Sequence, residues 1–261
     1  MKKNNIKKVG LVLLVISLIV GGYLVYHYYS RLRFEQINIE RSADNCDDNC
    51  LSISLTFLRS KGGGEFSANF NKEMELQIAN FLLSNTDSLQ MEGISIDEAL
   101  DSLIKDYNNM HELFPELPAY EYMVSDSIMW QNSKMLSVVS NRYSFTGEAN
   151  PLQQKVFTHF SLENGEVITN ENLFTDDEKV RKIAETYFKG AEEQYPIRPL
   201  NDKGFWFEGG VFQLPKNMGV AADALILYYE PFEIAPYMDV PFEVKVPIKE
   251  ILPYLTFSDT K

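Results

Sequence analysis

The feature that most constrains this chain is an apolar run over residues 9–30, which contains no Asp, Glu, Lys or Arg. As an α-helix this run would be about 33 Å long, close to the hydrocarbon thickness of a bilayer. Four lysines precede the run and two arginines follow it closely, so residues 1–8 should stay in the cytoplasm as a short tail. We therefore expect a single transmembrane anchor at residues 9–30 in the inner or cytoplasmic membrane, with the remaining chain in the periplasmic space.

A cleaved signal peptide is the alternative interpretation of the same run. No small-x-small cleavage motif follows the apolar residues, and no cysteine lies near position 20 to accept a lipid. An uncleaved anchor is therefore favoured, and both alternatives place residues 31–261 outside the cytoplasm.

The charge balance bears on the partners that the chain can have. The chain carries 24 Lys and Arg against 37 Asp and Glu. The four charged residues before position 31 are lysines, so residues 31–261 carry 20 basic against 37 acidic residues, a net charge of −17. Such a domain repels phosphate backbones, and we expect no nucleic-acid partner. The acidic surface either attracts a cationic protein or only keeps an exported domain soluble.

The two cysteines, Cys46 and Cys50, lie in an acidic stretch. Outside the cytoplasm a Cys-x-x-x-Cys pair is typical of a structural disulfide, provided that the Cα atoms come within ~7 Å. The neighbouring aspartates do not follow the register of a calcium-binding loop. We predict a disulfide between Cys46 and Cys50 and no metal site.

Alternating apolar and polar residues predict strands, and helical spacing predicts helices. The expected strands cover residues 51–57, 120–130, 134–145, 155–162, 224–229 and 240–246. The glycine run at residues 62–64 has no Lys-Ser or Lys-Thr after it, so we expect a hairpin that returns over Glu65 to Phe70, not a phosphate loop. Asn164 and Gly165 are expected to form a tight turn.

Three helices are expected. The first covers residues 71–83, with apolar residues at helical spacing. The second starts at Ser95, which forms a capping box with Glu98, and the third starts at Thr175, which forms one with Glu178.

Helices and strands cluster along the chain and do not strictly alternate. The expected fold class is therefore α+β, with a mainly antiparallel sheet and helices packed on one face, preceded by the transmembrane helix. We expect a smaller unit at residues 31–130 and a C-terminal unit at residues 131–261.

Several motifs carry a resemblance to a known family. Phe232-Glu-Ile-Ala-Pro-Tyr237 lies within the C-terminal phrase Leu225 to Pro247, and upstream lie Tyr143-x-x-x-Gly147 and Glu171-Asn-Leu-Phe174. Together these motifs resemble the extracytoplasmic domain of unknown function found in RsiV-type lysozyme-sensing anti-sigma factors and attached to some peptidoglycan deacetylases. Residues 34–126 resemble, more weakly, the companion domain that usually precedes it.

The resemblance implies an α+β envelope domain and, in one branch, a lysozyme-like protein ligand; it does not imply catalysis. Where family members commonly have Gly-Gly-Ala-His, this chain has Gly147-Glu-Ala-Asn150, so a role for that histidine is not carried over. Only the eight residues 1–8 precede the apolar run, too few for a sigma-binding domain, so we do not expect an anti-sigma factor.

The sequence offers no motif for catalysis. The three histidines are isolated from one another, and the metalloprotease, nucleophile-elbow and Ser-x-x-Lys motifs are all missing. Carboxylates that meet only in the folded protein are not excluded by this pattern. We expect no enzyme activity, no cofactor and no metal.

Candidate binding residues cluster near the C-terminal motif: Tyr228, Tyr229, Glu230, Glu233 and Tyr237. Such residues can bury a ring and still form hydrogen bonds, which suits a binding face. Alternatively, Tyr237 belongs to a rigid proline corner. Similarly, Phe205-Trp-Phe207 is either core or an exposed platform for glycan.

The function expected from the sequence is therefore a non-catalytic binding or sensing module of the cell envelope. Its ligand would be a lysozyme-like protein or peptidoglycan. The alternative is a structural or assembly component with no dedicated ligand.

Overall fold

The computed structural model describes residues 31–43, 50–84, 93–194, 205–235, 238 and 240–259. Among these residues no helix is both long and apolar enough to cross a bilayer; the apolar run of residues 9–30 lies outside them.

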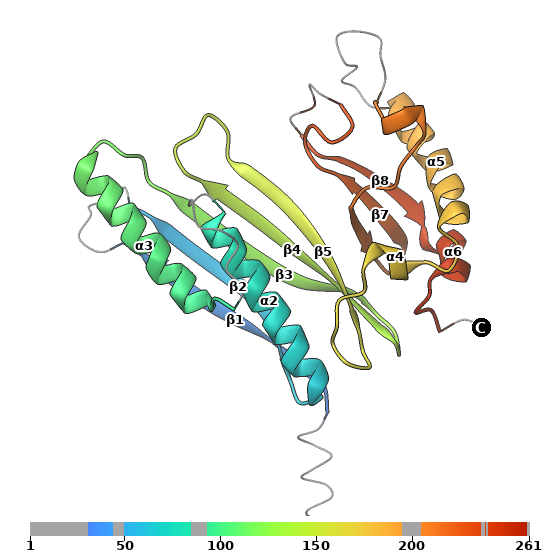
Figure 1. Cartoon of the computed structure of the whole chain (residues 1–261), viewed down its shortest axis with the longest axis horizontal. Helices are drawn as coiled ribbons and strands as arrows, with labels where there is room; N and C mark the ends of the chain where they lie inside the picture. Colours follow the sequence, from blue (N-terminus) through green and yellow to red (C-terminus); the bar gives the residue numbers. More distant parts are fainter. Residues whose placement is uncertain are drawn as a thin grey trace, which may run out of the picture.

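The described chain has an α+β fold built on two sheets (Figure 1). The first sheet has the strand order β1 (Arg33–Ser42), β2 (Ser52–Lys61), β3 (Glu121–Gln131), β4 (Met135–Phe145) and β5 (Leu152–Ser161). The second sheet has the order β6 (Asn217–Val220), β7 (Ala224–Tyr229) and β8 (Phe242–Pro247). The helices are α2 (Glu65–Leu83), α3 (Ile96–Leu113), α4 (Asn170–Leu173), α5 (Asp177–Gln194) and α6 (Ile248–Ile251), with short 3-10 turns η1 (Glu208–Gly210) and η2 (Leu252–Tyr254).

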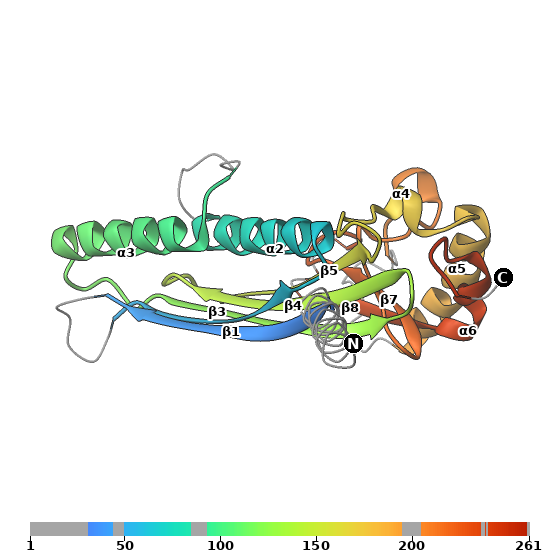
Figure 2. The ribbon, with the colours of Figure 1, turned by 90° about the horizontal axis from the view of Figure 1, so that it is seen from below.

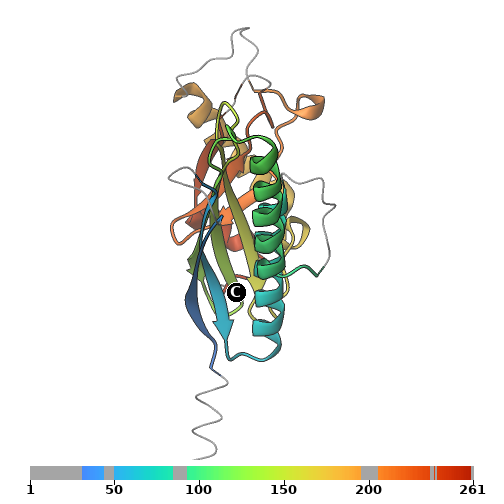
Figure 3. The same cartoon turned by 90° about the vertical axis from the view of Figure 1, so that its left-hand side faces the viewer.

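The strand pairs are antiparallel except β2 with β3, which are parallel. Parallel neighbours need a long crossover, and the segment that contains α2 and α3 provides it. Both helices lie on the same face of the five-stranded sheet (Figures 2 and 3). The expected division near residue 130 falls between β3 and β4, which are neighbours in this sheet.

The core under α2 and α3 follows directly from the residue spacing. In β2, Ile53, Leu55 and Phe57 are buried while Ser52 and Ser54 are exposed, as the two-residue period predicts. These side chains pack against the buried face of α2, which includes Phe81. The opposite face of the sheet is left without a helix in the described chain (Figure 2).

The second sheet packs against α5 through a cluster of aromatic rings around Phe188. Phe188 lies within 5.1–5.5 Å, centroid to centroid, of five other rings. Phe205 and Phe207 belong to this cluster, whereas Trp206 between them is 64% exposed. Of the two alternatives for this motif, burial in the core therefore holds for Phe205 and Phe207 and not for Trp206.

Two sequence predictions of local structure were wrong. Residues 65–70 are the first turns of α2, not a returning strand. The reason is that Phe66 and Phe70 continue, four residues apart, the buried stripe of Met74 and Ile78, so that the helix buries them on one face.

The start of α5 also differs from the prediction. Asp176, not Thr175, caps the helix: its Oδ1 accepts the amide of Lys179 at 3.0 Å. The Thr175 hydroxyl instead donates to the carbonyl of Tyr254, and Glu178 pairs with Arg181. The contact between residue 175 and η2 is tertiary, so local sequence could not indicate it.

The capping box at the start of α3 is confirmed. Ser95 Oγ accepts the amide of Glu98 at 3.2 Å, and Glu98 Oε2 accepts the amide of Ser95 at 2.9 Å. We expect Ser95→Ala to lower the free energy of unfolding by about 1 kcal/mol, measured by urea titration. Ser102→Ala, in the middle of α3, is the matched control; an equal loss in both variants would contradict the capping role.

Candidate functional site

A groove of about 590 Å³ lies where the two sheets meet. One wall comes from β3, β4 and β5, and the other from β7 and the start of β8. The described residues that line it are Met123, Ser125, Asn141, Arg142, Tyr143, Gln153, Gln154, Lys155, Tyr228, Pro241 and Glu243.

Asn217, the first residue of β6, holds the two walls of the groove together. Its Oδ1 accepts the amide of Phe157 at 3.1 Å, and its Nδ2 donates to the carbonyl of Lys155 and to Glu230 Oε1 at 2.9 Å. One amide side chain thus joins β5 to the second sheet, which fixes the width of the groove.

Two further contacts hold β5 against β6 at the same place. His159 Nε2 lies 3.0 Å from the carbonyl oxygen of Met218. A carbonyl oxygen can only accept a hydrogen bond, so Nε2 is the donor. Beside it, Gly219 lies against the ring of Phe157 so closely that a Cβ there would overlap the ring. Burial lowers the pKa of His159 to about 4, so this imidazole is neutral at pH 7.

The groove contains one ion pair that spans the two sheets. Lys155 Nζ of β5 lies 2.7 Å from Glu243 Oε2 of β8 and 5.7 Å from the centre of the Tyr228 ring. Burial, with the nearby Glu230 carboxylate, raises the pKa of Tyr228 to about 12, so its hydroxyl stays protonated and able to donate. Apart from this pair and Arg142, the described lining is uncharged.

Arg142 belongs mainly to the other face of β4, beneath α2. Its Nε donates to Ser140 Oγ and its Nη2 to Gln77 Oε1, both at 3.1 Å. Burial lowers the pKa of Arg142 and raises that of the nearby Asp126, whose Oδ2 accepts the amide of Leu58 at 3.4 Å. This network fixes β4 against α2 and so supports the groove from behind.

The arrangement suits the binding of a neutral polar ligand. Amides and hydroxyls offer both hydrogen-bond donors and acceptors, and Tyr143 and Met123 offer apolar surface. Glu243 is the one carboxylate among the described residues that line the groove, and it is paired with Lys155.

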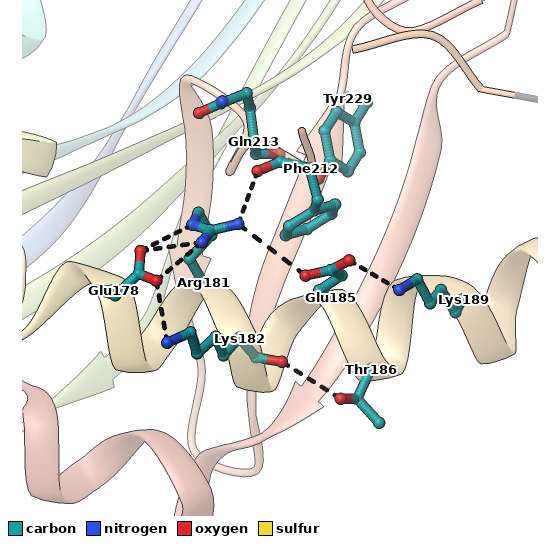
Figure 4. Close-up of polar contacts among 9 residues, drawn as sticks. All are labelled: Glu178, Arg181, Lys182, Glu185, Thr186, Lys189, Phe212, Gln213 and Tyr229. Carbon is teal, nitrogen blue, oxygen red and sulfur yellow. Dashed lines mark hydrogen bonds and ion pairs between the residues drawn. The ribbon is translucent and has the colours of Figure 1, made fainter. Parts of the chain in front are cut away.

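The structure does not bring all the predicted binding residues to one site. Tyr228 reaches the groove, but the next residue on β7, Tyr229, points to the α5 side, where its hydroxyl donates to the carbonyl of Gln213 at 2.9 Å (Figure 4). Burial raises the pKa of Tyr229, which is fully within the core.

Glu230 and Glu233 follow Tyr229 at the end of the strand. Glu230 is half-buried and accepts from Asn217, and burial raises its pKa. Glu233 is exposed and its Oε2 accepts the amide of Glu230 at 2.7 Å. Tyr237 lies outside the described residues.

The predicted disulfide falls partly outside the described chain. Cys50 is disulfide-bonded, whereas Cys46 lies among residues that the structure does not describe. The pairing of Cys46 with Cys50 therefore stays a prediction.

Most of the groove was missed by sequence reasoning. Asn141 lies within the strand predicted at residues 134–145, whereas Gln153 precedes the strand predicted at residues 155–162, because β5 begins at Leu152; both side chains are exposed. Polar side chains on adjacent strands could have indicated a shared surface, but only the register of the sheet shows that they face one groove.

Comparisons with known proteins match both halves of the described chain. Residues 44–153 match the family model described as "Deacetylase PdaC". Residues 171–249 match the model "Protein of unknown function (DUF3298)". No match was found among the curated proteins.

Two solved structures have a similar fold. A crystal structure of a DUF3298 family member from Bacteroides fragilis has a TM-score of 0.64 and 13% sequence identity; the alignment covers 87% of this chain and 94% of that chain. A DUF3298 family protein from Pseudomonas aeruginosa has a TM-score of 0.61 and 14% identity, with coverage of 87% and 95%. At such identities the likeness concerns the fold alone.

Proposed function

The chain carries a PdaC-family segment followed by a DUF3298-family segment, and on this premise we propose that it is a non-catalytic binding module of the cell envelope. Its ligand is a cell-wall glycan, peptidoglycan, held in the groove between the two sheets. The module is anchored by residues 9–30 and acts outside the cytoplasm.

The composition of the groove is the observation that supports this proposal. In a domain with a strong negative net charge, the described groove lining carries mostly amide, hydroxyl and aromatic side chains. Sugars present hydroxyls in the plane of the ring and C–H groups on its faces, so they need both hydrogen-bond partners and apolar surface. The lining supplies both over a volume large enough for a small ligand.

Retention on purified peptidoglycan tests the proposal. The full chain, kept in a detergent without a sugar head group, is expected to bind insoluble peptidoglycan and to stay bound as salt is raised. Salt resistance is expected because uncharged hydrogen bonds and ring contacts are not screened. Loss of retention at both low and high salt would contradict the proposal.

Variants in the groove make the test specific. Asn141→Ala and Gln153→Ala are each expected to weaken binding about fivefold, the effect of roughly 1 kcal/mol per hydrogen bond. Asn109→Ala, an exposed position on α3, is the matched control and should bind as the unchanged protein does. Equal affinities for all four proteins would place the ligand elsewhere.

The same preparation tests the non-catalytic part of the proposal. The PdaC family model takes its name from a deacetylase, so the peptidoglycan is incubated with the chain and assayed for released acetate. We expect no acetate release above that of the buffer. Acetate release that is lost when Glu243 is replaced would show that the protein is an enzyme.

A lysozyme-like protein is the second candidate ligand. The net charge of −17 over residues 31–261, from 20 basic and 37 acidic residues, favours a cationic partner. Binding of lysozyme that weakens steeply with salt, and that does not change in the groove variants, would favour this candidate over the glycan.

A further inference from the structure

The strand register aligns ten residues in two straight rows on the face of the five-stranded sheet that α2 and α3 leave open. Each row crosses all five strands from β1 to β5. The first row is Asn38, Thr56, Ser125, Asn141 and Lys155. The second row, two residues away on each strand, is Glu40, Ser54, Met123, Tyr143 and Gln153.

The two rows differ in chemistry. Every member of the first row carries an amide, hydroxyl or ammonium group, so this row can hydrogen-bond along its whole length. The second row has apolar surface at its centre, from Met123 and Tyr143. The two charged members lie at the ends: Glu40 at β1, and Lys155, which is paired with Glu243, at β5. The other two end members, Asn38 and Gln153, are neutral.

The groove occupies only part of these rows. The six residues from β3, β4 and β5 line it, and the four residues from β1 and β2 continue it beyond the second sheet. Asn38 and Ser54 are exposed, and Thr56 is half-buried, with its hydroxyl donating to Asn38 Oδ1 at 2.9 Å. In Figure 2 the helices lie on the other face of these strands, and the second sheet lies toward one end.

We propose that the groove and the two rows form one extended binding face for a neutral glycan chain bearing acetamido groups, which runs across the strands from the second sheet toward β1. This inference rests on the proposed function and adds the length and direction of the ligand. Five strands at a spacing of about 4.8 Å span roughly 19 Å, so the face accommodates a chain of several sugars.

The charges of the face select the class of ligand. A polyanion would be repelled by the acidic domain, and a polycation would find, outside the ion pair, only Glu40 in the two rows. A neutral chain with acetamido groups matches side-chain amides, which can donate and accept at once. The sugar rings can pack on Tyr143 and Met123 while their hydroxyls face the first row.

Dependence on oligosaccharide length tests the extended face. The probes are N-acetylglucosamine oligomers, a disaccharide and an octasaccharide, titrated calorimetrically into the full chain in a sugar-free detergent. The octasaccharide is expected to bind at least tenfold more tightly than the disaccharide, because only the longer chain reaches β1 and β2.

The double variant Asn38→Ala/Thr56→Ala identifies the far end of the face. It removes both partners of one hydrogen bond, so it leaves no unpaired group between them. We expect it to weaken octasaccharide binding about fivefold and to leave disaccharide binding unchanged. Asn109→Ala on α3 is the control and should change neither.

Three outcomes would overturn this inference. If both oligomers bind equally tightly, the ligand is confined to the groove and the proposed function stands without the extension. If the double variant weakens both oligomers alike, its effect is structural and the extended face is wrong. If neither oligomer binds while peptidoglycan is retained, the acetamido-glycan class is wrong; if peptidoglycan also fails, the proposed function falls with it.

Discussion

Replacing Gly165 by alanine is expected to lower the free energy of unfolding by about 3 kcal/mol, which is large against the total stability of an ordinary domain. Gly165 has a φ of 75°, in the left-handed region where an L-residue costs about 1–2 kcal/mol. A Cβ there would also lie 2.8 Å from Phe66 Cα, and nearer still to its carbonyl oxygen.

The steric cost of a Cβ at Gly165 is large because the atoms that it would meet belong to the backbone of Phe66. Phe66 is in the first turn of α2, and Asn69 from the next turn donates to the carbonyl of Asn164 at 2.9 Å. A side chain could rotate away from the new methyl group, but the helix start must move as a whole, which costs about 1–3 kcal/mol in a packed structure.

Gly209→Ala is the matched control for this prediction. Gly209 has a φ of 68°, and a Cβ there meets no atom within 4 Å, so it carries the conformational cost alone, about 1 kcal/mol. Urea titrations of the full chain and of both variants give the three free energies. Equal losses at the two glycines would show that the contact with Phe66 contributes nothing.

Acidification from pH 7 to pH 4 is expected to remove about 3 kcal/mol of stability through His159 alone. This residue is 3% exposed, and its pKa falls to about 4 in the folded protein, against about 6.5 in the unfolded chain. The unfolded state therefore binds more protons between these pH values. The stability is fully present above pH ~6.5 and is lost as the pH falls toward 4.

The geometry explains why the folded state resists this proton. His159 Nε2 already donates to the carbonyl of Met218, so the incoming proton must go to Nδ1, which is buried without a hydrogen-bond partner. Ser137, opposite His159 on β4, has a buried hydroxyl that is also unpartnered. A charged His159 ring would thus be buried away from water where the two sheets meet.

His159→Gln isolates this contribution. Gln can keep a donor toward β6 but does not titrate. Unfolding free energies of both proteins are measured by urea titration from pH 7 to pH 4, and the difference between them removes the effect of the carboxylates that they share. We expect the two curves to converge, or to cross, as the pH falls; parallel curves would contradict the assignment.

The candidate site was predictable only in its separate parts. The sequence predicts Tyr228 as a binding residue, and Tyr228 does line the groove. Tyr229 is predicted with it, yet adjacent residues of a strand point to opposite faces. Both faces of β7 are covered, by α5 on the side of Tyr229 and by β5 on the side of Tyr228. The sequence alone does not show that both faces of β7 are covered, so it does not separate Tyr228 from Tyr229.

The fold divides in the same way between local and tertiary causes. Local sequence determined the alternation in β2, the capping box at Ser95 and the extent of β7, because each depends on residues within one element. The parallel pairing of β2 with β3 and the rows that cross five strands were decided by tertiary structure. Each of these depends on which segments, distant in sequence, bury each other's apolar surface, and a period along the chain does not encode that choice.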